Sequence, residues 1–242
     1  MEDFRPETYG ERVADVYDQW YKPVETDDEV ALLAELAAGG RALELGVGTG
    51  RVAIPLAQHG VEVVGLDASP AMITAMRKKP GGDKVGVEMG DMEKVDVAGE
   101  FSLIFVVFNT FFQLYSQESQ LNCFRNVAAH LAPGGRFLIH GFVPDMSTVE
   151  AGQHIGVREA GLDLVRLEAT TYDRLEQRID TTQIRITEQG IRLVHAKLRY
   201  ALPSELDLMA QVAGLQLEAR YGAFDRSEFN DGSAWAVSIY RA

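Results

Sequence analysis

The amino-acid sequence predicts an α/β protein: a doubly wound, mostly parallel sheet of seven strands with an inserted lobe of antiparallel strands. Two patterns indicate this fold. Between residues 41 and 142, short apolar runs alternate with helix-periodic segments, which is typical of parallel strands joined by crossover helices. Between residues 164 and 201, apolar and polar residues alternate instead, which is typical of antiparallel strands.

Each element is predicted from a local signal. The first strand ends in a glycine cluster, and Ser69-Pro70 opens the helix after the second strand, with proline where its missing N–H costs least. Ser204, followed three residues later by Asp207, is a modest helix-start signal. The predicted core strands are 42–45, 61–66, 85–89, 101–108, 136–142, 215–221 and 235–240; the helices after residue 40 are 52–58, 69–79, 117–131 and 204–213; the lobe strands are 164–172, 177–187 and 191–201.

The predicted segments follow one another within a single compact domain. Helical periodicity in the N-terminal segment is interrupted by Pro23. The segments are an N-terminal helical lid over 1–38, a ligand-binding α/β core over 39–145, an inserted antiparallel substrate lobe over 146–202, and a return to the core sheet over 203–242.

Length and composition predict a soluble globular protein. The chain has 242 residues, of which 46% are hydrophobic and 24% are charged. Its one cysteine, Cys123, excludes an internal disulfide framework and fits a reducing compartment. The longest apolar run, 103–108, is far too short to cross a bilayer, and no secretory segment is recognisable. We therefore expect a cytoplasmic protein.

Net charge narrows the expected partners. The chain has 23 Lys and Arg against 36 Asp and Glu, a net charge of −13, whereas proteins that neutralise phosphates normally have the opposite balance. Binding to nucleic acid or to an anionic membrane is therefore not expected. An acidic surface mildly favours a cationic small-molecule partner. The sequence leaves the oligomeric state open.

The turn after the first strand is typical of a nucleotide site. The segment Glu44-Leu45-Gly46-Val47-Gly48-Thr49-Gly50 lies between a strand and a helix, so its backbone turns sharply and admits a ligand where side chains would block it. A dinucleotide-binding turn would have glycine or alanine at position 51, which is arginine, and a phosphate-binding Lys-Ser or Lys-Thr pair is missing. The carboxylate of Glu44 favours a cationic ligand group over a phosphate.

This turn, together with Asp67 at the end of the next strand, resembles the class I S-adenosylmethionine-dependent methyltransferases. The resemblance implies a Rossmann-like sheet and S-adenosyl-L-methionine as the cofactor. It implies that Gly46, Gly48 and Gly50 border the methionine part of the cofactor, with Glu44 near its ammonium group. Asp67 would accept hydrogen bonds from both ribose hydroxyls.

The same resemblance, which covers about residues 40–145, implies further cofactor contacts. Gly90-Asp91-Met92 is similar to the adenine-binding turn, in which Asp91 accepts a hydrogen bond from the exocyclic amino group and Met92 packs on the ring. Phe108 lies where the family lines the transferred methyl group. The remaining candidates are Ala68, and Tyr17 and Tyr21 of an aromatic N-terminal helix that also contains Tyr9.

Methyl transfer from a sulfonium depends on alignment of the acceptor atom with the methyl group more than on a dedicated base. His140, near the end of the fifth predicted strand, is the candidate general base, although a histidine satisfied inside the sheet fits equally well. Asn109 is the second candidate catalytic residue and would orient an amine or the cofactor's own amino group. His154 and His195 are candidates for the acceptor pocket. No His, Asp and Glu cluster has the spacing of a metal site, which predicts a metal-independent reaction.

The acceptor is predicted from two shorter resemblances. Residues 109–114 are similar to bacterial small-molecule and peptide N-methyltransferases, although Phe111 and Phe112 fit equally well as core residues. The lobe resembles the lid of sugar-amine and glycine-type N-methyltransferases. These resemblances imply methylation of a nitrogen, or of a hydroxyl oxygen, in a small molecule or short peptide. A NAD-dependent oxidoreductase, which Arg51 argues against, and a noncatalytic module that binds S-adenosylmethionine are the alternatives.

Overall fold

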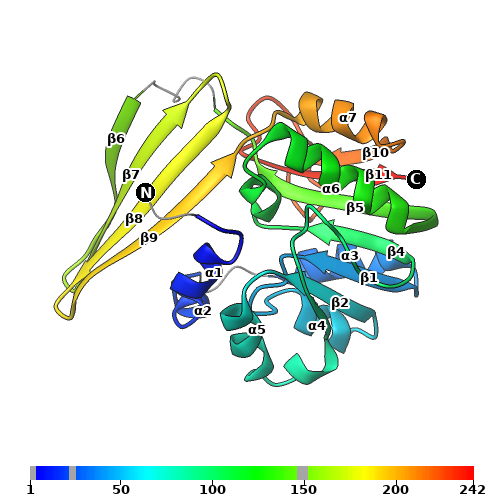
Figure 1. Ribbon diagram of the computed structural model, residues 1–242, viewed down its shortest axis with the longest axis horizontal. Helices are drawn as coiled ribbons and strands as arrows, with labels where there is room; N and C mark the ends of the chain where they lie inside the picture. Colours follow the sequence, from blue (N-terminus) through cyan, green and yellow to red (C-terminus); the bar gives the residue numbers. More distant parts are fainter. Residues whose placement is uncertain (1–3, 22–25, 146–151) are drawn as a thin grey trace.

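The predicted division into a sheet core and an antiparallel lobe is confirmed by the computed structural model, which describes residues 4–21, 26–145 and 152–242. The lobe stands beside the core, and two short N-terminal helices lie between them (Figure 1). None of the described helices is long and apolar enough to span a membrane.

The core sheet has seven strands in the order β10-β11-β5-β4-β1-β2-β3. The five strands from β1 to β5 pair in parallel, and β11 pairs antiparallel with both β5 and β10. The chain order reverses between β1 and β4, and ligands of such sheets bind beyond the carboxyl ends of the strands at this point. The strands are β1 Arg41–Leu45, β2 Glu62–Asp67, β3 Gly86–Met89, β4 Phe101–Val106, β5 Leu131–Phe142, β10 Gln216–Tyr221 and β11 Trp235–Arg241.

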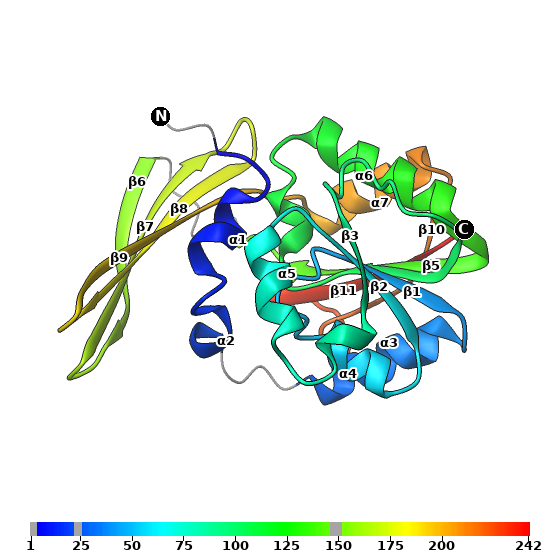
Figure 2. The ribbon, with the colours of Figure 1, turned by 60° about the horizontal axis from the view of Figure 1, so that its bottom comes forward.

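Helices cover both faces of the core sheet (Figure 2). One face packs against α6 and α7, through buried residues that include Phe124 and Met209, and the fully buried thiol of Cys123 lies in the same cluster. The other face packs against α3 and α4, through Leu33 and Leu56 among others. The helices are α3 Asp27–Ala37, α4 Ala53–Gln58, α5 Pro70–Arg77, α6 Gln117–His130 and α7 Pro203–Val212, with two short 3-10 helices, η1 Gly82–Lys84 and η2 Thr110–Gln113.

The two predicted helix starts have different outcomes. Helix α5 begins as expected, because Ser69 Oγ accepts a hydrogen bond from the Met72 N–H at 3.3 Å and Pro70 follows. Helix α7 begins one residue earlier than predicted, at Pro203, and Leu202 precedes it without a side-chain cap. The prediction from Ser204 was wrong. Proline already has the helical φ, and it has no backbone N–H that would stay unpaired at the first position of the helix.

The lobe has four antiparallel strands, one more than the sequence predicts. Strand β6 was missed because Ile155 and Val157 are its only large apolar residues, and its register shifts between Val157 and Glu159. It is an edge strand, so its conformation depends on pairing with β7 rather than on its own pattern. The lobe strands are β6 Gly152–Ala160, β7 Leu164–Asp173, β8 Arg178–Thr187 and β9 Gly190–Arg199.

The N-terminal segment forms two short helices, α1 Thr8–Val13 and α2 Tyr17–Trp20, and Pro23 lies outside the described residues. Fully buried Val13 clusters with Met72 of α5 and Val194 of β9. The Arg192 guanidinium donates to Asp15 at 2.6 and 2.9 Å. These contacts hold the N-terminal helices against both the core and the lobe.

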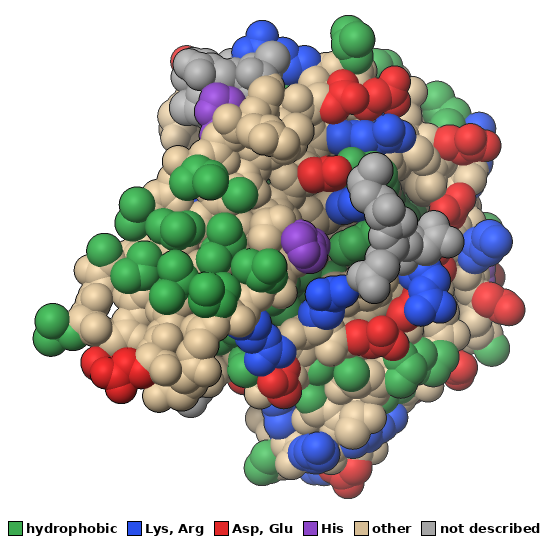
Figure 3. All heavy atoms as spheres, turned by 60° about the vertical axis from the view of Figure 1, so that its left-hand side comes forward, with side chains coloured by type: hydrophobic (Ala, Val, Ile, Leu, Met, Phe, Trp, Pro, Cys, Tyr) green, Lys and Arg blue, Asp and Glu red, His purple; other side chains and the backbone are tan. Residues whose placement is uncertain are grey.

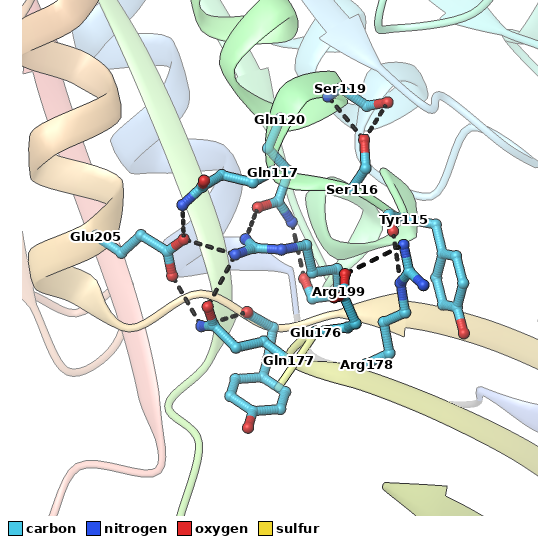
Figure 4. A network of polar contacts seen from close by, with 11 residues as sticks. Tyr115, Ser116, Gln117, Ser119, Gln120, Glu176, Gln177, Arg178, Arg199 and Glu205 are labelled. Atoms are coloured by element: carbon cyan, nitrogen blue, oxygen red, sulfur yellow. Dashed lines mark hydrogen bonds and ion pairs between the residues drawn. The ribbon is translucent and has the colours of Figure 1, made fainter. Parts of the chain in front are cut away.

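A buried arginine joins the lobe to the core (Figure 4). Arg199, at the end of β9, is 5% exposed and donates to Gln120 of α6 at 2.6 Å and to Glu205 of α7 at 2.7 Å. It also donates to Gln177, in the turn between β7 and β8, at 2.8 Å, and Gln120 donates back to the Arg199 carbonyl at 2.8 Å. One guanidinium therefore connects two core helices with two parts of the lobe.

Candidate functional site

A cavity of ≈ 500 Å³ brings together residues from the ends of β1, β2 and β3 and from the N-terminal segment. Seven of the thirteen predicted site residues line it: Tyr17, Gly46, Gly48, Asp67, Ala68, Asp91 and Met92. The other six are absent from its lining: Tyr21, Glu44, Gly50, Phe108, Asn109 and His140. Of these six, Tyr21 contacts two lining residues directly, Tyr9 and Tyr17.

The glycine turn has the backbone conformation that its sequence predicts. Gly46 has a φ of +72°, and a Cβ at this position would lie 2.3 Å from the Cγ2 of Thr110. Gly48 also has a positive φ, of +56°. Gly50 differs, because a Cβ there would lie 2.7 Å from Met76, so this glycine permits helix packing rather than forming the cavity wall. The turn therefore leaves space for a ligand beside Gly46 and Gly48.

Asp67 is fixed by the backbone at the end of β2. Its Oδ2 accepts a hydrogen bond from the Gly48 N–H at 2.7 Å, and its Oδ1 accepts one from the Ser69 N–H at 2.8 Å. Burial raises the pKa of Asp67 from its ordinary value, and these backbone donors act in the opposite direction. A carboxylate has about four acceptor positions. The carboxylate therefore keeps acceptor capacity for a ligand with hydroxyl groups.

The turn after β3 forms another wall of the cavity. Asp91 Oδ1 accepts a hydrogen bond from the Glu93 N–H at 2.9 Å, which fixes the turn, and Met92 packs against the core cluster. Leu114 and Tyr115, between η2 and α6, also line the cavity, as does Ser119 of α6. The carboxylate and the apolar surface suit a flat heterocycle with a hydrogen-bond donor at its edge.

Glu44 lies under the glycine turn with one unsatisfied oxygen. The residue is 3% exposed, and its Oε2 has no hydrogen-bond partner among the described residues. Burial raises the pKa of Glu44 well above its usual range, against the lowering effect of Arg51. Unpaired buried carboxyl oxygens are rare and costly. This one therefore fits a site whose ligand supplies a cationic donor at the turn.

Arg51 anchors the glycine turn to α3. It donates to the two carboxylate oxygens of Glu29 at 2.6 and 3.2 Å, and its guanidinium carbon lies 5.2 Å from the centroid of the Phe108 ring. The sequence identifies this arginine only as a departure from dinucleotide-binding turns. In the structure it links α3 to the aromatic residue at the end of β4.

Aromatic side chains enclose the cavity from the N-terminal side. Tyr9 and Tyr17 line it, whereas Tyr21 supports them, with its hydroxyl 3.1 Å from that of Tyr9 and its ring centroid 4.7 Å from that of Tyr17. Sequence reasoning chose Tyr17 and Tyr21 and left Tyr9 out. The missed signal is Gly10, where a Cβ would lie 2.6 Å from Ser69, so that glycine brings Tyr9 close to the β2 end.

The two candidate catalytic residues, His140 and Asn109, accept backbone hydrogen bonds next to the end of β4. His140 Nδ1 accepts a hydrogen bond from the Phe108 N–H at 3.3 Å, and its ring packs between Trp235 and Phe224, with centroids 5.0 and 4.7 Å away. Burial lowers the pKa of His140 to about 4, so its imidazole is neutral at pH 7. Asn109 Oδ1 accepts from the Phe142 N–H at 2.8 Å. Their polar atoms thus fix the backbone around Phe108.

Phe111 and Phe112 belong to the core. They are 1% and 2% exposed and pack within the cluster that contains Phe124. The ordinary interpretation of these two residues is therefore confirmed.

A second cavity, of ≈ 1100 Å³, lies between the N-terminal segment and the lobe. It shares Phe4, Arg5 and Lys197 with the first cavity. Both lobe histidines predicted for an acceptor pocket, His154 and His195, line it. Its other lobe residues are mostly hydroxyl, amide or charged side chains: Gln153, Thr170, Thr171, Asp180, Thr181 and Thr182.

Lys197 is a lining residue that sequence reasoning missed. Its Nζ lies 5.4 Å from the ring centroid of Tyr115 and 5.6 Å from that of Phe4. The Tyr115 hydroxyl donates to Asp180 of β8, which ties the first cavity to the lobe. Within the part of the chain that the structure describes, no three His, Cys, Asp or Glu side chains form a group able to hold a metal ion.

Comparisons with known proteins agree with this geometry. A family profile described as "Methyltransferase domain" matches residues 42–135. The CcbJ methyltransferase from Streptomyces caelestis is 40% identical in its solved structure, with 99% of each chain covered and a TM-score of 0.94. The cypemycin N-terminal methyltransferase from a Streptomyces species is 29% identical, over 77% of this chain and 76% of the relative.

A more distant structure shares the fold. It is that of CalS10 with S-adenosylmethionine bound, an amino pentose methyltransferase from Micromonospora echinaspora. It is 23% identical, with a TM-score of 0.70 and coverage of 93% of this chain and 96% of that one. The similarity therefore extends across core and lobe alike.

Proposed function

Since the chain belongs to the class I S-adenosylmethionine-dependent methyltransferases, we propose that it transfers a methyl group to an amine nitrogen of a small molecule or a peptide terminus. The observation that carries the proposal is the pair of adjoining cavities, one with the glycine turn and two acidic strand ends, the other walled by the lobe. Two of the similar proteins, the cypemycin N-terminal methyltransferase and an amino pentose methyltransferase, support an amine acceptor.

The first cavity is the proposed cofactor site. Asp67 has free acceptor positions for the two ribose hydroxyls, and Asp91 with Met92 suits the adenine. Gly46 and Gly48 line the cavity where the methionine part would lie, and the free oxygen of Glu44 suits its ammonium group. When bound, S-adenosyl-L-methionine supplies an electrophilic methyl carbon on a positively charged sulfur.

The second cavity is the proposed acceptor site. It adjoins the cofactor site through Phe4, Arg5 and Lys197, so an acceptor held by the lobe would reach the first cavity past these residues. Its polar lining suits a hydroxyl- or amide-bearing molecule. The lobe residues would align the acceptor nitrogen, and the aromatic residues around Tyr17 would exclude water from the reacting atoms.

A nitrogen acceptor is favoured over an oxygen acceptor by the lining of the cofactor site. None of the described residues around that cavity is a histidine, His140 lies behind Phe108, and the two histidines of the second cavity, His154 and His195, lie outside the cofactor site in which the methyl group would be held. A hydroxyl acceptor profits from a base, whereas an amine needs only to be neutral and correctly aimed. His140 would therefore act by positioning Phe108, and the amine would lose its proton to solvent.

Two measurements test the proposal. Calorimetric titration should detect binding of S-adenosylmethionine but not of NAD, and binding of NAD alone would favour an oxidoreductase. A methyl-labelled cofactor should then label amines or short peptides in a panel that also contains phenols. Label transferred only to phenols would contradict the nitrogen acceptor, and tight cofactor binding without transfer to any of the panel would favour a noncatalytic module.

Asp67→Ala tests the ribose contact. Removing two charge-assisted hydrogen bonds, at about 1.5 to 3 kcal/mol each, should weaken cofactor binding at least about 100-fold in calorimetric titration. The control is Asp83→Ala, an acidic residue of η1 that does not line the cavity. Equal affinity of both variants, with unchanged circular dichroism, would contradict the role of Asp67.

A further inference from the structure

The charged residues that the two cavities share are both cations. Of the described residues, Phe4, Arg5 and Lys197 line both cavities. An acceptor that enters the first cavity from the second would therefore pass two positively charged side chains. This local charge is opposite in sign to the net charge of the chain, −13. Figure 3 shows Lys and Arg side chains along the boundary between the lobe and the core.

The two shared cations differ in their partners. Arg5 lies 3.3 Å from a carboxylate oxygen of Glu7, which lines neither cavity. Among the described residues, Lys197 has no ion pair, and its Nζ lies over the rings of Tyr115 and Phe4 instead. A ring attracts the ammonium charge but gives its three N–H donors no oxygen to bind. Lys197 is therefore the shared cation that is left for an anionic ligand group.

Asp180 does not neutralise Lys197, although the two residues are directly opposite on β8 and β9. Opposite charges in this arrangement normally attract each other. The Asp180 carboxylate accepts the hydrogen bond from the Tyr115 hydroxyl instead, and between these two described residues there is no ion pair. Tyr115 is fixed in turn by Arg178, which donates to the Tyr115 carbonyl at 3.2 Å and lies 4.7 Å from the ring centroid (Figure 4). The tyrosine thus holds the acid away from the lysine.

We propose that Lys197 binds a carboxylate of the methyl acceptor, and that the acceptor is therefore an amino acid. The inference rests on the proposed function, because it assigns a residue at the junction of the proposed cofactor and acceptor sites. One cation without an anionic partner suits a singly charged carboxylate, and an ammonium group forms charge-assisted hydrogen bonds with its oxygens. The acceptor nitrogen then points into the first cavity, and the rest of the acceptor lies among the polar groups of the second.

This assignment distinguishes amino acids from other amines. A peptide terminus or an amino sugar has no carboxylate beside its amine, so Lys197 would have only neutral oxygens to bind. Asp180 also lines the second cavity, and its negative charge repels a carboxylate from its own position. The acid and the lysine therefore act together to direct the acceptor carboxylate to the junction.

A cycle of two changes, one in the protein and one in the acceptor, tests the proposal. Lys197→Met removes the charge and keeps a side chain of similar length, and the methyl ester of each amino acid removes the charge of its carboxylate. Binding of a panel of amino acids and their esters is measured by calorimetry with the protein saturated with S-adenosylhomocysteine, so turnover is not needed. A methyl-labelled cofactor then gives kcat/KM for the same acceptors.

Lys197→Met should weaken binding of amino acids, and lower their kcat/KM mainly through KM, by about tenfold or more. The same substitution should change these quantities less than about twofold for the esters, which offer no negative charge. Lys197→Arg keeps the cation and should retain most of the binding. Lys84→Met, in an exposed lysine of η1 that lines neither cavity, should have no effect.

Equal losses for amino acids and esters in Lys197→Met would overturn the carboxylate contact, as would esters that bind the wild type as tightly as the acids do. If Lys197→Met does not fold, as judged by circular dichroism, Lys197→Gln takes its place. Label on peptides or amino sugars but on no amino acid would support the proposed reaction and overturn this inference. Lys197-dependent binding of amino acids without any transfer of label would support the contact and contradict the proposed reaction.

Discussion

Among single residues, Glu44 shows how a ligand site is prepared at a cost in stability. Its carboxyl group is buried, its Oε2 has no partner, and its pKa is raised mainly by burial. The folded protein therefore binds one more proton than the unfolded chain between the ordinary pKa of 4.5 and the raised one. Stability contributed by this proton is present below pH 4.5 and is lost as the pH rises through that window.

Glu44→Gln should therefore stabilise the ligand-free protein and weaken cofactor binding. The amide carries no charge to desolvate, so the gain in melting temperature should be larger at pH 7 than at pH 5. Loss of the charge opposite an ammonium group should reduce affinity for S-adenosylmethionine by about tenfold or more in calorimetry. A variant that binds as tightly as the wild type would contradict the ammonium contact.

His140 illustrates a different kind of buried polar residue, one whose nitrogen supports the backbone. Its pKa is lowered to about 4, so it stays neutral from pH 6 to 9. His140→Ala should leave the shape of the pH–rate profile unchanged over this range and reduce kcat less than about tenfold. Removal of a general base would instead cost about 100-fold to 10,000-fold. A loss of that size on an amine acceptor would contradict the positioning role.

At the scale of elements, the turn between β1 and α4 requires both a positive φ and the absence of a side chain at Gly46. Gly46 has a positive φ, and its missing side chain lets Thr110 pack closely against the turn, since a Cβ would lie 2.3 Å from the Thr110 Cγ2. Gly46→Ala should abolish measurable cofactor binding, because a Cβ would displace Thr110 and enter the cavity wall. Gly134 has a similar φ of +74° with no neighbour within 4 Å of a Cβ, so Gly134→Ala controls for backbone strain alone. Equal cofactor affinity of the two variants in titration would contradict this account.

Elements with a strong local pattern were predicted correctly, and those that depend on neighbours were not. The parallel strands β1 and β4 are buried along almost their whole length, so their apolar runs are continuous and visible in the sequence. Strand β6 lies at an edge with two large apolar residues, and pairing with β7 defines it. Helix α7 begins at Pro203 because proline needs no cap, whereas Ser204 has the commoner signal.

The candidate site was predictable where it is formed by one turn, and less so where distant segments meet. Gly46, Asp67 and Asp91 follow strands directly, so their meeting at one sheet edge follows from the parallel order. Tyr9 and Lys197 reach the cavity only because α1 packs between α5 and β9. Apart from Gly10, no local pattern indicates that packing, so sequence reasoning left Tyr9 and Lys197 out of the predicted site.

At the scale of the whole molecule, the Arg199 network determines how the lobe sits on the core. Arg199→Met would leave Glu205 without its buried cationic partner, and breaking such a pair costs about 3 to 5 kcal/mol. The free energy of unfolding in urea should fall by about that amount, and amide exchange in β8 and β9 should accelerate. Arg226→Met, which removes an exposed pair with Glu35, should lower the free energy of unfolding far less. Equal losses would contradict the importance of the network.

The fully buried thiol of Cys123 has a practical consequence for measuring how the lobe is placed relative to the core. Burial raises the pKa of Cys123, so the reactive thiolate is suppressed, and reagents do not reach it in the folded protein. Since the chain has no other cysteine, a sulfhydryl introduced on the lobe becomes the single addressable position on the natural background. Spin labels or fluorophores can then report the distance between lobe and core without prior removal of a native residue.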